Sequence, residues 1–289
     1  MFILKKHFIR LLLVVLMTFS SHLFAKELSQ LNLGILSLAP PSKIYKQWKP
    51  FADYLGSQLN MKVNIVAPRG FGKLKKMAEN KKVDIFYTNS YIFYRLKQAG
   101  KAVALAQMEN VAGSITSKSD IFVRADAKID NISQLKGKKI AFVSPMGAGG
   151  YLAPRAFLYK EGLKTKEEST EVFTKNLTNS IYGVLLGKVD AATMCGVNYK
   201  LMSKKINTGE IKIIASSTNY PENAFAAHAK LPKKLIDKIK SILVSMSSHT
   251  QGQKVLSNMK AMKIKRFLPY DDKVEKLTRT LMKSGKFSE

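Results

Sequence analysis

The sequence predicts an α/β fold in which two similar lobes are each built around a largely parallel sheet. Short apolar segments alternate with amphipathic segments through almost the whole chain, which is typical of helices layered on a sheet. One pattern occurs twice, at 82–87 and at 188–193: Lys-Val-Asp follows an amphipathic segment and begins an apolar strand. Two similar halves of one chain indicate two similar lobes.

The apolar segments predict strands, and the amphipathic segments between them predict helices. We expect strands at 31–37, 62–67, 83–87, 121–124, 139–143, 170–173, 189–194 and 212–215. We expect helices at 45–59, 70–80, 90–99, 150–161, 177–186, 198–205, 233–247 and 271–282. This order fits an α/β protein without a long linker.

The first residues predict a secretory signal peptide over 1–25. Lys5, Lys6 and Arg10 precede an apolar run at 11–17, and Ala25 offers a small residue for cleavage. The run is too short to span a bilayer as a helix of about 20 residues, and no cysteine follows closely to carry a lipid. We therefore expect export to the periplasm and cleavage near Ala25.

The charge of the chain is strongly basic. Its formal net charge is +28, and three of the basic residues leave with the expected signal peptide. Such a charge attracts nucleic acid, anionic membranes or anionic ligands, but here it is spread along the chain as lysine instead of clustered with arginine and aromatic residues. This distribution favours a solvated surface, and no nucleic-acid partner is expected.

Few residues could bind a metal or form a disulfide. Cys195 is the only cysteine, so no internal disulfide is expected. Beyond the signal peptide only His228 and His249 remain, which argues against a zinc site with several histidines. The sequence predicts neither a cofactor nor a metal.

Two segments are candidates for crossings between the lobes. The stretch at 113–120 is rich in Ser, Thr and Gly, and 216–219 is a candidate for the return. The first lobe would then comprise 27–113 plus 216–289, and the second lobe 114–215. A ligand cleft is expected where strand ends and helix N-termini of both lobes meet.

Several motifs, in order along the mature chain, resemble one known family. They are WKPFADYL at 48–55, VDI at 83–85, LKGKKIAF at 135–142, GYLAP at 150–154, LGKVDAA at 186–192 and a late strand that ends with LP at 231–232. Each is weak alone, but their order and spacing resemble the phosphate/phosphite/phosphonate ABC-transporter substrate-binding proteins over nearly the whole mature chain.

The resemblance implies the type II periplasmic binding protein fold, which is a two-lobed α/β fold with a ligand cleft between the lobes. It also implies that the chain captures a small-molecule ligand for an ABC permease in the inner membrane, without catalysis. We expect the protein to act as a monomer.

A glycine-rich turn at 144–150 links an expected strand to an expected helix. Its small residues would let a ligand approach backbone N–H groups, which suits an anion. The alternative is a turn that only packs tightly. The resemblance places hydroxyl side chains of phosphonate binders where this chain has Gly147, Ala148 and Gly149, and polar residues where it has Leu177, Met194 and Cys195. It therefore implies the fold and the transport role, but not phosphonate specificity.

The candidate ligand-binding residues are mostly aromatic, soft or small. They are Tyr45, Tyr87, Asn89, Ser90, Tyr91, Ser144, Met146, Gly147, Ala148, Gly149, Gly150, Tyr151, Met194, Cys195 and Tyr220. Several aromatic rings facing one cavity could enclose a cationic or flat apolar ligand, and the alternative is that about half of them fill the lobe cores. Met146, Met194, Cys195 and His228 also raise the hypothesis of a soft-metal site.

Two other functions compete with ligand capture for import. An enzyme would need a nucleophile and a base, and Cys195 with His228 is the only Cys/His candidate, without an acidic residue at a recognisable spacing. Export and the lack of acidic residues at strand ends argue against catalysis. A periplasmic sensor subunit for a membrane signalling partner would use the same lobe closure, and sequence alone does not separate it from an importer subunit.

Overall fold

The computed structural model describes residues 28–36 and 39–288. The expected signal peptide at 1–25 and its cleavage site lie outside the described residues. The remaining chain forms two main sheets and a small two-stranded sheet.

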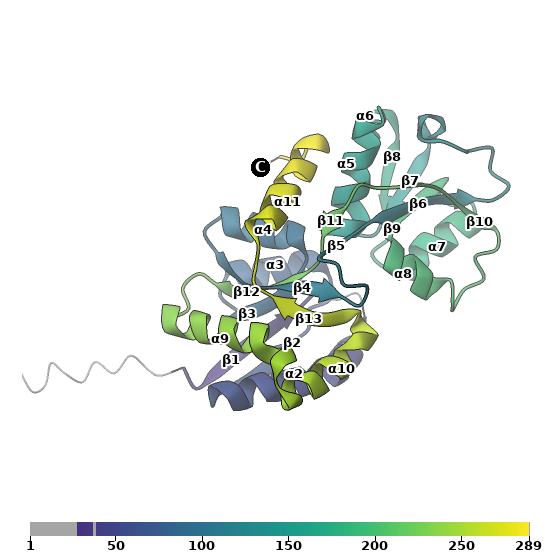
Figure 1. Cartoon of the computed structure of the whole chain (residues 1–289). Helices are drawn as coiled ribbons and strands as arrows, with labels where there is room; N and C mark the ends of the chain where they lie inside the picture. The colour runs from purple at the N-terminus through teal and green to yellow at the C-terminus, as the bar shows by residue number, and fades with distance from the viewer. Residues whose placement is uncertain (1–27, 37–38, 289) are drawn as a thin grey trace, which may run out of the picture. The chain divides into compact units, whose positions relative to one another are not determined.

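The first lobe is built on a six-stranded sheet with the order β13-β4-β12-β3-β1-β2 (Figure 1). Its strands are β1 (Gln30–Ile35), β2 (Lys62–Val66), β3 (Ile85–Thr88), β4 (Ala102–Asn110), β12 (Ala224–His228) and β13 (Ile264–Leu268). Its helices are α2 (Pro41–Leu59), α3 (Phe71–Glu79), α4 (Ser90–Gln98), α9 (Lys233–Ser245) and α10 (Thr250–Met259), with the short turns η4 (Met246–Ser248) and η5 (Lys260–Met262).

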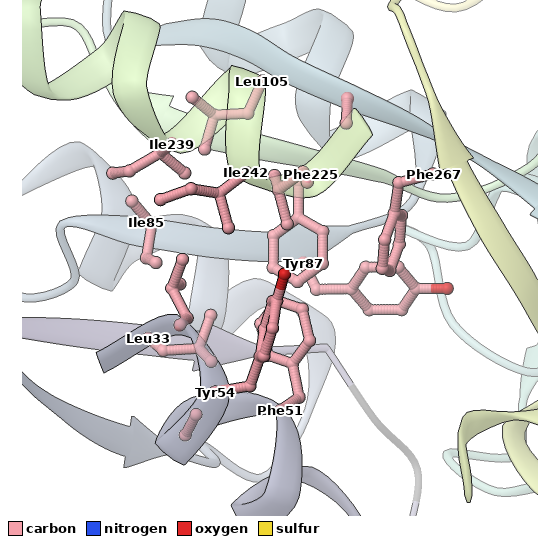
Figure 2. Close-up of a cluster of buried hydrophobic side chains, with 14 of the residues drawn as sticks. Leu33, Phe51, Tyr54, Ile85, Tyr87, Leu105, Phe225, Ile239, Ile242 and Phe267 are labelled. Atoms are coloured by element: carbon pink, nitrogen blue, oxygen red, sulfur yellow. The ribbon is translucent and has the colours of Figure 1, made fainter. Parts of the chain in front are cut away.

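Alternating residues of the central strands of this sheet are buried on its two faces. Ile85 and Tyr87 pack with α2 and α9 in one cluster, whereas Phe86 packs with α3 and α4 in another. Figure 2 shows the first cluster, in which Phe51 and Phe225 stack with ring centroids 5.1 Å apart. Burial on both faces explains why β3 begins with three large apolar or aromatic residues in a row, at 85–87.

The second lobe is built on a five-stranded sheet with the order β10-β6-β9-β7-β8. Its strands are β6 (Ser119–Arg124), β7 (Lys139–Phe142), β8 (Thr170–Phe173), β9 (Ala191–Cys195) and β10 (Ile211–Ser216). Its helices are α5 (Ala153–Lys160), α6 (Thr165–Glu168), α7 (Leu177–Leu185) and α8 (Gly196–Met202), with the turn η2 (Ile132–Leu135) and the π-helical turn η3 (Ala148–Leu152) that leads into α5.

A two-stranded antiparallel sheet joins the two main sheets along the chain. β5 (Thr116–Ser117) leads from the first sheet to the second, and β11 (Tyr220–Pro221) leads back. The last helix, α11 (Asp272–Ser284), contacts α4 of the first lobe and α5 of the second. The residue boundaries predicted for the lobes stay a prediction. That prediction assigns α11 to the first lobe, whereas α11 contacts helices of both lobes.

The repeated Lys-Val-Asp pattern has the same structural role in both lobes. Asp84 Oδ2 accepts a 2.8 Å hydrogen bond from the backbone N–H of Asn32, at the start of β1. Asp190 Oδ2 accepts a 2.7 Å bond from the N–H of Lys139, at the start of β7. Each aspartate therefore fixes the beginning of a neighbouring strand, which gives the repeat a physical reason.

Both sheets are mixed, which corrects the expectation of largely parallel sheets. β1 pairs parallel with β3, and β7 pairs parallel with β8 and β9, but β12 is antiparallel to β3 and β4. In the second sheet β6 is antiparallel to β9 and β10. The antiparallel strands β6 and β12 follow the connecting strands β5 and β11, so each enters its sheet from the direction of the other lobe.

Candidate ligand cleft

A cavity of about 770 Å³ is lined by residues of both lobes. This volume is within the usual range for small-molecule sites. The first lobe contributes Leu36, Ala39, Pro40, Lys43, Gln47, Phe71, Tyr87, Asn89, Met108, Ala261, Met262 and Lys263. The second lobe contributes Val143, Gly147, Ala148, Gly149, Gly150, Asn176, Leu177, Thr178, Cys195, Val197, Asn198, Leu201, Met202 and Lys205, and the returning strand and the two residues after it contribute Tyr220, Glu222 and Asn223.

Asn89 caps α4 and also contacts the second lobe. Its Oδ1 accepts a 2.9 Å bond from the N–H of Ile92, and its Nδ2 donates a 3.0 Å bond to the carbonyl of Met146. The first bond caps the helix, a position where asparagine is favoured. The second bond joins the start of α4 to the glycine turn. Asn89 therefore fixes the position of the glycine turn opposite α4.

Tyr87 forms part of the first-lobe wall of the cleft. Its ring packs 4.9 Å from Trp48 and 5.3 Å from Phe225, and its hydroxyl donates to Met108 Sδ at 2.7 Å. Burial raises the pKa of Tyr87, and the charge of Glu222 raises it further. The residue therefore presents a neutral phenol to the cleft.

The glycine turn supplies backbone donors to the cleft. The N–H of Gly147 donates to the carbonyl of Ser144, and the N–H of Leu152 donates to that of Gly147. Within the described part of the chain, the N–H groups of Ala148, Gly149 and Gly150 have no hydrogen-bond acceptor. Such groups at the start of a helix can bind a polar or anionic ligand atom.

Tyr220 occupies the space that a side chain at position 149 would need. A Cβ atom on Gly149 would lie 2.2 Å from Tyr220 Oη and 2.4 Å from Tyr220 Cζ. The carbonyl of Gly149 accepts from Ser119 Oγ, which holds the turn in place from the other side. A hydroxyl-bearing residue at position 149 is therefore incompatible with the position of Tyr220.

Cys195 lies beside Tyr220 in the cleft, and both side chains are neutral. Burial raises the pKa of the Cys195 thiol and of the Tyr220 phenol. The two side chains belong to the same packed cluster. A protonated thiol is a weak nucleophile and a weak metal ligand, so this environment disfavours both uses of Cys195.

Glu222 places a carboxylate in the cleft, and the sequence analysis did not identify it. Its Oε1 accepts from Asn110 Nδ2 at 2.9 Å and from Ser117 Oγ. No described residue donates to its Oε2. Glu222 is the only acidic residue among the described residues that line the cleft. Its position directly after Pro221, where the crossing strand β11 ends, was the available signal.

From the predicted set, the cleft brings together Tyr87, Asn89, residues 147–150 of the glycine turn, Cys195 and Tyr220. The other candidates lie elsewhere. Tyr45 is 52% exposed on α2, and Met194 is buried in the second-lobe core. Ser90 donates a hydrogen bond to the carbonyl of Pro221, and Ser144 accepts one from the N–H of Met146. Tyr91, Met146 and Tyr151 line a different cavity. These residues therefore support the cleft or lie outside it.

The hypothesised pairing of Cys195 with His228 is not assembled. β12 begins at Ala224, next to the cleft residue Asn223, and His228 is at its other end, roughly 14 Å away for a strand of this length. Across residues 28–36 and 39–288, no group of three or more His, Cys, Asp or Glu side chains is placed to hold a metal. The geometry gives no support to a Cys/His catalytic pair or to a metal site that uses His228.

Comparison with known proteins identifies the family. Residues 33–274 match the model of the ABC transporter phosphonate periplasmic substrate-binding proteins. The chain belongs to this family. It is 26% identical to the phosphonates-binding periplasmic protein of Escherichia coli (strain K12) over 79% of this chain and 70% of that protein. It is also 26% identical to the phosphate-import protein PhnD of Mycolicibacterium smegmatis (strain ATCC 700084 / mc(2)155) over 73% of this chain and 70% of that protein.

The fold agrees with that of a solved structure, XAC2383 from Xanthomonas citri bound to chloride ion. The TM-score is 0.78 with 19% identity, over 89% of this chain and 98% of that one. The predicted two-lobed type II periplasmic binding protein fold is confirmed. The chain is thus a substrate-binding component of the ABC-importer class, and the proteins of this family bind substrates without being enzymes.

The described helices are all too short or too polar to cross a membrane.

Proposed function

We propose that this chain is exported, encloses a small ligand bearing a cationic group in its interlobe cleft, and delivers that ligand to a permease of the inner membrane. The ligand is neither phosphate nor a simple phosphonate. The sensor alternative has no supporting observation in the cleft, and the family favours import.

The packing of Gly149 against Tyr220 carries this proposal. The position that would need a hydroxyl donor for a phosphonate has no room for a side chain, and Gly147 and Ala148 also lack one. Each hydrogen bond missing from a desolvated dianion costs on the order of 1 to 3 kcal/mol. Three missing bonds at about 1.4 kcal/mol each would weaken binding roughly a thousandfold.

Glu222 and its neighbours support the choice of a cationic group. A half-buried carboxylate attracts a cation and repels a dianion more strongly than a fully solvated one would. Tyr87 and Tyr220 also line the cleft, and tyrosine is a residue type that can contact a cation. Three lysines line the cleft too. Lys43 and Lys205 are exposed and therefore screened by solvent, whereas Lys263 is half-buried.

Two measurements test the proposal. Calorimetry with phosphate, phosphite, methylphosphonate and 2-aminoethylphosphonate should give no submicromolar dissociation constant. Mass spectrometry of ligand extracted from protein purified from its host should identify a cationic small molecule, and intact-mass analysis should place the mature N-terminus near Lys26.

The variant Glu222→Gln should weaken binding of the extracted ligand by at least about tenfold, because it removes the charge and keeps the hydrogen-bond acceptor for Asn110. Glu79→Gln, which removes a carboxylate outside the cleft, is the matched control. Submicromolar binding of any of the four phosphorus compounds would show the assignment of ligand chemistry to be wrong.

A further inference from the structure

A second cavity of about 580 Å³ shares no lining residue with the ligand cleft. We call it the flank pocket. Its walls come from α3 and α4 of the first lobe, from α5, α6 and the start of the glycine turn in the second lobe, and from the segment 286–288 after α11. Like the cleft, it is therefore bounded by both lobes.

The flank pocket is strongly basic. Six basic side chains line it, against the single acid Glu79: Lys75, Lys76, Arg95, Arg155, Lys166 and Lys286. Glu79 pairs with Lys75. Within the described residues, Lys76, Lys166 and Lys286 form no ion pair and donate no side-chain hydrogen bond. Their charges are available to a ligand.

A buried guanidinium distinguishes this pocket from a merely basic surface. Arg155 is 3% exposed, and its Nη1 and Nη2 donate to the hydroxyls of Tyr151 and Tyr159 at 2.9 and 3.2 Å. Its Nε forms an ion pair with Glu171 Oε1 at 3.7 Å but has no hydrogen-bond partner among the described residues. A guanidinium has five N–H donors, so Arg155 retains unused donors in a lining where buried donors are normally satisfied.

Three aromatic residues, Tyr91, Tyr151 and Phe287, also line the pocket. The ring of Phe287 lies 4.4 Å from the Arg155 guanidinium carbon, and its centroid is 5.5 Å from Tyr91 and 5.2 Å from Tyr151. Arg95 donates to the carbonyl of Ser288, which anchors this segment to α4. Aromatic faces beside basic side chains suit an organic group that carries phosphate.

We propose that the flank pocket binds a polyanion with at least two phosphate charges, such as an organic diphosphate, separately from the ligand of the cleft. The bases stand on several elements around one cavity, so a single small monoanion would neutralise few of them. A diphosphate can contact bases of both lobes at once, and Arg155 with its unused donors lies in the wall.

The test is calorimetry with pyrophosphate on the full mature protein at about 0.15 M ionic strength. The wild type should bind pyrophosphate, and Lys166→Gln/Lys286→Gln should weaken binding by at least about tenfold, because two exposed bases of the pocket lose their charge. The matched control Lys234→Gln/Lys238→Gln makes the same change in net charge on exposed residues of α9, and it should change the affinity by less than about twofold.

A second pair of variants separates the two cavities. Lys43→Gln/Lys205→Gln neutralises the exposed lysines of the cleft and should leave pyrophosphate binding unchanged. Failure of the wild type to bind, an equal loss in the α9 control, or a loss confined to the cleft pair would each overturn the proposal. The proposed function is judged separately, by the extracted ligand and Glu222→Gln.

Discussion

At the scale of single residues, the close approach of Tyr220 to Gly149 shapes the wall of the cleft. The sequence analysis found the missing hydroxyls at Gly147, Ala148 and Gly149, but it could not find the reason at position 149. That reason is a contact between residues 71 positions apart in the chain, where an aromatic ring fills the place of a side chain. At position 149, the lack of a side chain and the presence of Tyr220 are thus one structural feature.

Gly149→Ala should destabilise the protein by about 1 to 3 kcal/mol, because the new methyl group overlaps the Tyr220 ring. Urea unfolding measures the change in free energy. Gly147→Ala is the control in the same turn. Its new Cβ atom would lie 3.3 Å from the Ser144 carbonyl oxygen, so the loss of stability should be smaller. In the double variant with Tyr220→Ala, the added cost of Gly149→Ala should largely vanish, and equal costs in both backgrounds would refute the overlap.

His228 should make stability depend on pH. Its side chain is 3% exposed, and burial, followed by the charges of Lys81, Lys230 and Lys101, lowers its pKa, while Asp84 opposes the shift. Because the folded-state pKa lies below the unfolded value of about 6.5, the unfolded state binds a proton first, and stability falls as pH decreases through this range.

Thermal unfolding at several pH values from 7.5 to 5.5 measures this effect. His228→Asn should flatten the profile, because asparagine can keep an acceptor for the N–H of Lys230 without titrating. The exposed His249→Gln is the control and should keep the wild-type slope. A wild-type slope in His228→Asn would exclude His228 as the source.

At the scale of elements, the sequence predicted most of the strands and helices because each carries its own periodic pattern. Apolar strands such as β7 and β8 were found with nearly the observed bounds. β4 and β13 were missed, since only tertiary pairing makes them strands and polar residues such as Gln107 and Glu109 interrupt β4. A late strand was expected to end at 231–232, whereas β12 ends at His228. The residues of the cleft were predicted only in part, because the sequence reveals a residue only where a local pattern marks it. Local motifs located the glycine turn, whereas Glu222 has no local pattern.

The aspartates of the repeated pattern should contribute unequally to their lobes. Asp84→Ala leaves the N–H of Asn32 without its acceptor and should cost about 1.5 to 3 kcal/mol, since Asp84 is 7% exposed. Asp190→Ala should cost less, because Asp190 is half-exposed. The exposed Asp53→Ala should cost under about 0.5 kcal/mol.

The single tryptophan, Trp48, lies in the first-lobe core and therefore reports on that lobe, while circular dichroism reports on both. In urea, Asp84→Ala should shift the Trp48 fluorescence transition, and Asp190→Ala should mainly shift the circular dichroism transition. An unchanged fluorescence midpoint in Asp84→Ala would show that the bond to Asn32 does not stabilise this sheet.

At the scale of the whole molecule, three segments connect the lobes. β5 and β11 form a short antiparallel pair, and the side chain of Glu222 bonds Asn110 at the end of β4 and Ser117 in β5. α11 contacts both α4 and α5, and Lys97 of α4 pairs with Glu275 of α11. The carboxylate that faces the cleft is thus part of the same hydrogen-bonded group as the connecting strands, so a ligand at Glu222 contacts the hinge directly.

Ligand binding should therefore close the cleft by rotation about β5 and β11. Small-angle scattering with the extracted ligand at saturation should show a smaller radius of gyration than the ligand-free protein, because a ligand that contacts both walls favours the closed state over the open one. Glu222→Gln at the same ligand concentration should show less compaction, because a smaller fraction of the protein carries ligand. Compaction should return when more ligand is added to saturate the variant. Tight binding without any change in radius would mean either that the ligand does not drive closure or that the ligand-free protein is already closed. Scattering from the ligand-free protein decides between these two, because a closed molecule would fit the calculated curve of a closed relative before any ligand is added.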